Sequence, residues 1–377
     1  LEKPSRNRSG TGQIMEQKSA ISYFYSVFIA AIVGSIAIYF YSGWMGVYQT
    51  NILSVLELSL SFDNAVINAL ILANMTLFWR KMFITWGMLI AVFGMRLLFP
   101  ILIVYATTDL GFIEAFSLSL NDPVKYEEVI QNSHHILMSF GGTFLLMVFF
   151  TFLFDKEREV HWIAFIEKRA SKWASLGEIK IATVMITMSV IGYFAPNEVL
   201  AGDRVLTIDK SEIVLGMVYG VTLYVIIELI RGMLEGKDES ENELEGVSKQ
   251  AQANALKGGF ASFMYLELID ASFSFDGVLG AFAVTQNIII MMIGLGIGAF
   301  AVRSLTLLLV DRKTVQEYRY LEHGAMWSIG MLAVSMIIQI FVHLPSFIIT
   351  TIAILPITVA FINSISANKK LLENPEN

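Results

Sequence analysis

The sequence predicts an all-α polytopic membrane protein with about ten transmembrane helices, arranged as two inverted five-helix repeats. Three observations support this fold class. Hydrophobic residues make up 55% of the 377 residues and charged residues only 16%, whereas soluble domains carry about a quarter charged residues. Apolar runs long enough to cross a bilayer recur along the whole chain. An acidic motif inside one run returns five runs later.

The apolar runs set the order of the elements. Residues 1–14 are polar, and we exclude them as a tag or linker. The first repeat is predicted at 15–200 and the second at 212–368, followed by a cytoplasmic tail at 369–377. The ten predicted spans are 21–42, 52–74, 82–104, 134–154, 180–195, 212–232, 258–283, 287–310, 324–343 and 346–364.

The distribution of positive charge predicts the orientation. With these spans, 21 of the 26 Lys and Arg residues fall on one side of the membrane and three on the other. Positive charge collects on the cytoplasmic side, so both termini are expected in the cytoplasm. On that side, segment 155–179 reads as an amphipathic surface helix, and the Glu-rich segment 233–257 as a solvated linker between the repeats.

An internal repeat indicates a duplicated architecture. Residues 57–64 (ELSLSFDN) and 270–277 (DASFSFDG) share the pattern acid-x-Ser-x-Ser-Phe-Asp. In each half the next span holds one arginine, Arg96 or Arg303, and the span after it contains a histidine, His135 or His323. The copies are five spans apart, an odd number, so they are expected to cross the bilayer in opposite directions. Inverted repeats of this kind are typical of secondary transporters, whose substrate site lies at mid-membrane.

The buried charges point to a cation site. Acids inside membrane spans are costly, and here they outnumber the two arginines, so bound cations or protons are expected to compensate them. Arg96 and Arg303 either support this site or simply pair with acids to hold the halves together. His135 and His323 are predicted as ligands or proton carriers, or as ordinary interfacial residues. The predicted metal-binding residues are Glu57, Ser61, Asp63, Asn64, Glu267, Asp270, Ser274 and Asp276.

Helical spacing predicts an unwound segment in each repeat. Asp63 follows Glu57 by six residues, and Asp276 follows Asp270 by six, so neither pair can share one face of an unbroken helix. We therefore expect each helix to unwind near the Ser-Phe-Asp sequence and to expose carbonyl oxygens. Carboxylate, hydroxyl, amide and carbonyl oxygens suit the hard divalent cations Mn²⁺, Mg²⁺ and Ca²⁺. Nitrogen from a histidine would shift this preference toward Mn²⁺ or Zn²⁺.

These residues resemble those of a known family. The motifs around Glu57, Asp63 and Asn64, at 267–277 (ELIDASFSFDG) and at 321–324 (LEHG), are similar to those of TerC-like integral membrane proteins of the LysE transporter superfamily. The chain looks most like the bacterial and phage branch described as a domain of unknown function. The resemblance implies tellurite resistance and manganese export, and a bacterial or phage-encoded protein that lies in the bacterial inner membrane. It also implies that the family's acidic motifs correspond to Glu57, Asp63, Asn64, Glu267, Asp270 and Asp276.

Three functions follow, in this order. The first is a secondary transporter that exports a divalent cation, Mn²⁺ before Ca²⁺ or Mg²⁺, in exchange for protons, with the bilayer as its surroundings and no tightly bound cofactor. The second is a non-transporting membrane subunit of a tellurite or metal stress-resistance complex, acting as a homo-oligomer or with an accessory protein. An intramembrane enzyme ranks last, because HExxH, Gly-x-Ser-x-Gly and cysteine are all absent from the sequence. Net charge of −7 argues against nucleic acid as a partner.

Overall fold

The computed structural model is predominantly helical. It describes residues 19–373 except 109, 157, 174–178, 196–197, 202–203, 208, 236–246, 283, 313–317 and 343. The predicted tag at 1–14 and the last residues of the predicted tail therefore lie outside the described residues. Seven described helices are long and apolar enough to cross a membrane: Tyr25–Leu60, Leu77–Tyr105, His134–Leu153, Lys210–Ile230, Ile288–Asp311, Leu321–Gln339 and Ile348–Lys369. Each of the ten predicted spans coincides with helical residues, but ten crossings and the inverted repeat remain predictions.

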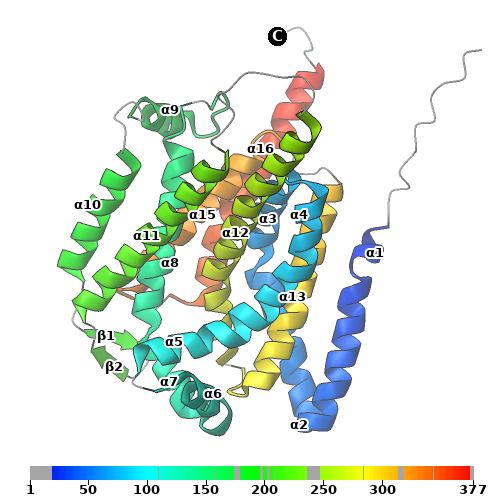
Figure 1. Ribbon diagram of the computed structural model, residues 1–377, viewed down its shortest axis with the longest axis vertical. Helices are drawn as coiled ribbons and strands as arrows, with labels where there is room; N and C mark the ends of the chain where they lie inside the picture. The colour runs from blue at the N-terminus through cyan, green and yellow to red at the C-terminus, as the bar shows by residue number, and fades with distance from the viewer. Residues whose placement is uncertain are drawn as a thin grey trace, which may run out of the picture.

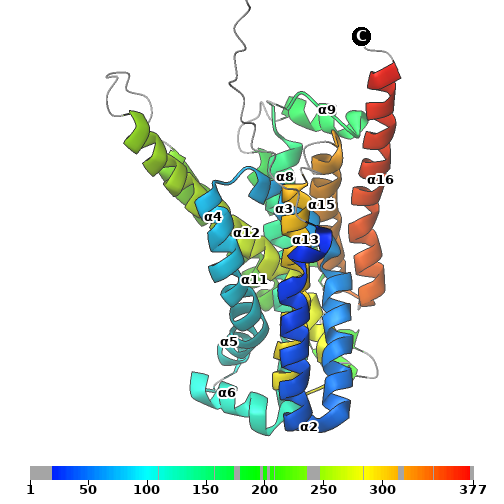
Figure 2. The same cartoon turned by 90° about the vertical axis from the view of Figure 1, so that its right-hand side faces the viewer.

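The chain begins with a helical hairpin. A single turn, α1 (Ala20–Tyr23), leads into α2 (Tyr25–Leu60), and Gly43 interrupts α2 with φ of 70° and ψ of −164°. Positive φ of this kind is readily adopted only by glycine. Figure 2 shows the two arms of α2 side by side. Asn51 Nδ2 lies 3.5 Å from Ser35 Oγ across the hairpin. The first arm of α2 thus supplies the first predicted span, and the second arm supplies the beginning of the second span.

The second predicted span ends in regular α-helix, whereas the third contains π-helical turns. The second span ends with α3 (Phe62–Ala73). The third is assembled from α4 (Leu77–Met82), η1 (Phe83–Gly87), η2 (Ile90–Leu98) and α5 (Phe99–Thr107), of which η1 and η2 are π-helical. Wide turns of this type are uncommon and occur mostly at functional sites.

Between the third and sixth predicted spans, two short helices precede the long helix α8 and one short helix follows it. After α6 (Phe112–Asn121) and α7 (Pro123–Asn132), the apolar helix α8 (His134–Leu153) crosses the bundle. It is followed by α9 (Ala164–Trp173) and the short apolar helix α10 (Ile179–Phe194). In Figure 1, α9 lies across the end of the bundle where the C-terminus also lies, and α6 and α7 lie at the opposite end.

The second half begins with a small hairpin that the sequence analysis did not predict. Strands β1 (Glu198–Ala201) and β2 (Arg204–Thr207) pair antiparallel, with Glu198 opposite Thr207. Five helices follow among the described residues: α11 (Lys210–Glu235), α12 (Val247–Phe282), α13 (Ile288–Asp311), α15 (Leu321–Gln339) and α16 (Ser346–Glu373). Helices α11 and α12 both extend into the predicted linker 233–257, whose residues 236–246 lie outside the described part.

Glycine contacts bring the two halves together. A Cβ atom at Gly294 of α13 would lie 2.7 Å from the Leu53 Cβ atom of α2, and one at Gly298 would lie 2.8 Å from the Ser54 carbonyl oxygen. Ser54 Oγ donates a hydrogen bond to the Gly294 carbonyl oxygen at 2.9 Å. Small residues allow this close approach of helix backbones, which is a common packing device in membranes. The second arm of α2 is therefore held directly against α13.

Candidate functional site

The first motif forms a buried ion pair within its own half. Glu57 on α2 accepts hydrogen bonds from Arg96 on η2 and from Ser61 Oγ, the latter at 3.0 Å. The Glu57 and Arg96 side chains are only 2% and 3% exposed. Arg96 also donates to the Ala91 carbonyl oxygen inside the π-helical segment. A buried carboxylate requires such a partner, so Arg96 neutralises Glu57.

The second motif uses one arginine for two acids. Arg303 Nη2 on α13 lies 3.2 Å from Glu267 Oε1 and 3.9 Å from Asp270 Oδ2, both on α12. The same guanidinium donates to the carbonyl oxygens of Phe83 at 2.6 Å and Gly87 at 2.7 Å. Arg303 therefore compensates Glu267 more closely than Asp270, and it also ties the π-helical third span to α13.

A hydrogen bond joins the two halves at the centre of the site. Asn64 Nδ2 on α3 donates to Asp270 Oδ1 on α12 at 2.6 Å. Asn68 lies one turn further along α3, and both asparagines are at least 98% buried. The Oδ1 atoms of Asn64 and Asn68 have no hydrogen-bond partner. Buried polar atoms are normally satisfied, so a free amide oxygen on the residue that contacts Asp270, with another one turn away on α3, is suited to accepting a cation or a proton donor.

Asp63 is a further buried acid. It lies in the first turn of α3 and is 3% exposed. The first turn of a helix offers backbone N–H groups and a positive dipole end, which favour a carboxylate there. None of the ion pairs among the described residues includes Asp63. Asp63 is thus a buried acid of the first motif that no arginine pairs with among the described residues.

The predicted helix breaks are found in one repeat only. Ser61, with φ of −103° and ψ of 19°, separates α2 from α3. At this interruption Ser61 N still bonds to Glu57 O at 2.9 Å and Ala65 N to Ser61 O at 3.2 Å. In the second repeat the prediction is wrong, because α12 runs as one helix from Val247 to Phe282. Carbonyl ligands from two unwound segments are therefore not part of this arrangement.

The close approach of Gly277 to Glu57 shows how the two motifs lie relative to each other. A Cβ atom there would lie 2.8 Å from Glu57 Oε2, so the end of the second motif packs against the acid that opens the first. The two motifs thus contact each other at this point of the fold. The side chains of Ser274 and Asp276 lie outside the described residues, so their predicted roles stay predictions.

The two predicted histidines lie away from these acids. His135 Nε2 on α8 is 2.9 Å from Glu212 Oε2 on α11. His323 Nδ1 on α15 is 3.1 Å from Glu167 Oε2 on α9. Each imidazole therefore has a carboxylate partner outside the repeated motifs. Neither Glu167 nor Glu212 was predicted from the sequence, because their partners are 156 and 77 residues distant in the chain.

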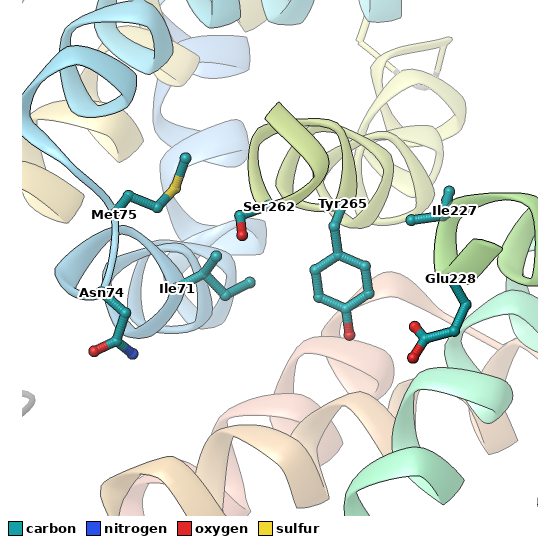
Figure 3. A pocket seen from close by; sticks show the side chains of 7 residues that line it. All are labelled: Ile71, Asn74, Met75, Ile227, Glu228, Ser262 and Tyr265. Carbon is teal, nitrogen blue, oxygen red and sulfur yellow. The ribbon is translucent and has the colours of Figure 1, made fainter. Parts of the chain in front are cut away.

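An open pocket of about 230 Å³ lies between α3, α11 and α12 (Figure 3). Its lining combines apolar and polar side chains: Ile71, Asn74, Met75, Ile227, Glu228, Ser262 and Tyr265. Figure 3 shows the Tyr265 hydroxyl and the Glu228 carboxylate directed to the same side of the pocket. Tyr265 precedes Asp270 by five residues on α12, which corresponds to a rise of roughly 7–8 Å. The pocket thus lies near the Asn64–Asp270 pair and offers a carboxylate.

Preformed metal coordination is not seen among the side chains that the structure describes. They include no group of three or more His, Asp or Glu residues placed to hold a metal ion. Of the predicted metal-binding residues, Glu57 and Ser61 contact each other, and Asn64 contacts Asp270. Asn68 was not among the predicted residues, although its spacing of four residues from Asn64 was a usable signal.

Comparisons with known proteins found one family model and one relative that is named as a membrane protein. A family model described as "Protein of unknown function (DUF475)" matches residues 62–371. A stretch of 102 residues is 33% identical to the "Uncharacterized membrane protein YceF" of Bacillus subtilis (strain 168). It covers 26% of this chain and 38% of that relative, so the match spans well under half of the relative's length. No solved structure matches significantly. Neither comparison names TerC-like proteins, so that resemblance stays a prediction.

Proposed function

We propose that this chain, which belongs to the DUF475 family and is an integral membrane protein, is a secondary transporter that exports a divalent cation. The observation that carries the proposal is the Asn64–Asp270 contact between the two halves, flanked by free amide oxygens. Oxygen ligands of this kind suit Mn²⁺, Mg²⁺ or Ca²⁺, and we take Mn²⁺ as the first ion to test. Protons exchanged at the same carboxylates would compensate their charge when the cation leaves.

The unequal contacts of Arg303 suggest which acid binds the cation. Glu267 is held at 3.2 Å and also accepts a second hydrogen bond from the same nitrogen, at 3.3 Å. Asp270 is held at 3.9 Å, beyond direct hydrogen-bond distance. A cation that approaches Asp270 therefore displaces a weaker contact. Asp63 and the amide oxygens of Asn64 and Asn68 would supply further ligands, while Glu57 and Glu267 keep their arginines.

The pocket beside Tyr265 provides an entrance for this route. It is open and carries the exposed carboxylate of Glu228, which attracts cations. It lies at the end of α3 that is remote from Asp63, between α3 and α12. With the predicted orientation this end faces the cytoplasm. A cation would thus pass from Glu228 along α3 and α12 to Asp270.

Flux measurements test the proposal. The full chain is reconstituted in liposomes that contain a Mn²⁺-sensitive dye, and Mn²⁺ is added outside. We expect Mn²⁺-dependent flux that falls at least tenfold in Asp270→Asn and in Asp63→Asn. Glu114→Gln, which changes an exposed carboxylate on α6, serves as the control and should retain the flux. Absence of flux for Mn²⁺, Mg²⁺ and Ca²⁺, or flux that persists in both Asp variants, would contradict a transporter.

The ion pairs of Arg96 and Arg303 also support a second function. Arg96 and Arg303 each satisfy an acid of the repeated motif, as expected if these pairs only hold a scaffold together. In that case the chain is a non-transporting subunit of a stress-resistance complex, as homo-oligomer or with an accessory protein. Deleting residues 236–246 discriminates between the two functions. Loss of metal or tellurite resistance in cells, with flux in liposomes unchanged, would favour the scaffold.

A further inference from the structure

Helix α9 is fixed to the bundle by one carboxylate. Glu167 is 3% exposed and accepts hydrogen bonds from the backbone N–H of Trp162 at 2.9 Å and from Trp327 Nε1 at 2.9 Å. His323 Nδ1 lies 3.1 Å from the same group. Trp327 and His323 both belong to α15, so these contacts fix the position of α9 and its rotation about its own axis. One face of α9 therefore always points away from the bundle.

That outward face combines aromatic and basic side chains. Phe165 and Trp173 are 69% and 61% exposed, and Ile166 is 40% exposed. Arg169 and Lys172 are exposed on the same face at helical spacing. The Arg169 guanidinium lies 4.1 Å from the centre of the Phe165 ring. The acid of α9 is buried and already bonded, so the exposed charge of this helix is positive.

The position of α9 places this face at the level of lipid headgroups. The helix lies across the end of the bundle, directly before α10 and after α8 (Figure 1). Both neighbours are apolar helices, so the ends of α8 and α10 lie near the membrane surface. Aromatic rings and basic residues together are typical of helices that lie in the interface and attract anionic lipids.

We propose that the outward face of α9 is a binding surface for the anionic phospholipid headgroups of the adjacent leaflet. Lys172 and Arg169 contact phosphate groups, and Phe165 and Trp173 insert between headgroups. The positive charge selects anionic over zwitterionic lipid, because basic side chains near a negatively charged membrane surface are attracted to it. This inference is independent of metal transport and holds for a transporter or a scaffold alike.

A single introduced cysteine tests the surface, because the chain contains none. Trp173→Cys is labelled with a fluorophore in the full chain, reconstituted in vesicles of phosphatidylcholine alone or with phosphatidylglycerol. We expect quenching by acrylamide, a neutral quencher that the charge of the vesicles does not repel, to be at least twofold weaker in the vesicles with phosphatidylglycerol. Phe165→Cys repeats the measurement in case the first variant does not fold. Equal quenching in both lipid compositions would overturn the proposal and favour a soluble partner for this face.

Charge reversal supplies the matched comparison. Arg169→Glu, combined with the labelled position, should raise quenching in the phosphatidylglycerol vesicles to the value in phosphatidylcholine. Lys125→Glu makes the same charge change on the exposed surface of α7, at the opposite end of the molecule, and should leave the protection intact. If both reversals act equally, net charge rather than α9 determines the lipid preference, and the assignment of this face is wrong.

Discussion

The two repeated motifs look alike in sequence but differ in their charge balance. In the first half, Arg96 faces one acid, Glu57. In the second half, Arg303 faces both Glu267 and Asp270 and also binds two carbonyl oxygens of the third span. The ion pair of Arg96 therefore balances one acid, whereas Arg303 of the second half faces one acid more than it can neutralise. In the proposed transporter this difference makes Asp270 the central acid of the site, with Asp63, Asn64 and Asn68 of the first half as further ligands.

The largest expected effect comes from removing the arginine that serves two acids. Arg303→Met leaves Glu267 and Asp270 uncompensated, and we expect it to lower the free energy of unfolding by about 3–5 kcal/mol. Denaturant unfolding in detergent micelles measures this. Arg96→Met, the counterpart in the first half, should cost less because one acid is affected. An equal or larger loss in Arg96→Met would break the comparison between the halves.

The second-largest effect is expected from removing the hydrogen bond between Asn64 and Asp270, which joins the two halves. Asn64→Ala removes the hydrogen bond to Asp270 and should lower the free energy of unfolding by about 1.5–3 kcal/mol, as for other bonds to charged groups. It should also reduce Mn²⁺ flux in liposomes. Asn68→Ala is the matched control, since its Oδ1 atom has no partner to lose. Reduced flux with unchanged stability in Asn68→Ala would sharpen the assignment of its oxygen as a ligand.

A glycine next to Arg303 gives a smaller effect. A Cβ atom at Gly87 would overlap with Glu267 and Arg303 side-chain atoms. Gly87→Ala should therefore cost about 1–3 kcal/mol by overpacking the second ion-pair group. Gly94→Ala lies in the same span, where the nearest atom would be 3.5 Å away, and should be nearly neutral. Thermal unfolding of the two variants side by side checks this. Equal melting temperatures would contradict the tight packing of the second group.

The smallest effect concerns a carboxylate that is stabilised without any arginine. Burial alone raises the pKa of Glu167, but hydrogen bonds from His323 and Trp327 outweigh it and lower the pKa from 4.5 to about 2. The ionised form is thus favoured by folding, and its contribution is complete above pH 4.5 and is lost as the pH falls toward 2. Glu167→Gln should cost about 1 kcal/mol at pH 7.

The pH dependence of the melting temperature then distinguishes Glu167 from the acids that pair with Arg96 and Arg303. The difference in melting temperature between Glu167→Gln and the parent chain should shrink as the pH falls from 4.5 toward 2. A difference that is constant over this range would show that the charge of Glu167 is not stabilising. Glu322→Gln is the control, because it changes a more exposed carboxylate in the first turn of α15, which pairs with Arg158 at 3.3 Å. This variant should have little effect at any pH.

Some of the site was predictable from residues near one another in the chain. The Glu57, Asp63 and Asn64 motif and its copy at 267–277 stand out because acids are rare in apolar helices. The ion pairs with Arg96 and Arg303 were one of two alternatives that the sequence left open, and the structure forms both pairs. The close contact at Gly294 follows from small residues in an apolar helix.

Other features could not be predicted because they depend on packing. The same Ser-Phe-Asp sequence interrupts the helix at Ser61 but lies within an unbroken helix in α12. Local sequence is nearly identical at the two places, so the surroundings decide between the two conformations. The partner of His323 likewise comes from α9, 156 residues away, and no periodicity relates the two positions.

The amino-acid sequence by itself determined that this protein is a set of apolar helices carrying a repeated acidic motif, because hydropathy and helical spacing are properties of short segments. The tertiary structure alone decided that Asn64 meets Asp270, that Arg303 serves two acids and that Glu167 fixes α9. Each of these contacts joins residues distant in the chain, and only the packing of whole helices selects among the many partners that a buried charge could have.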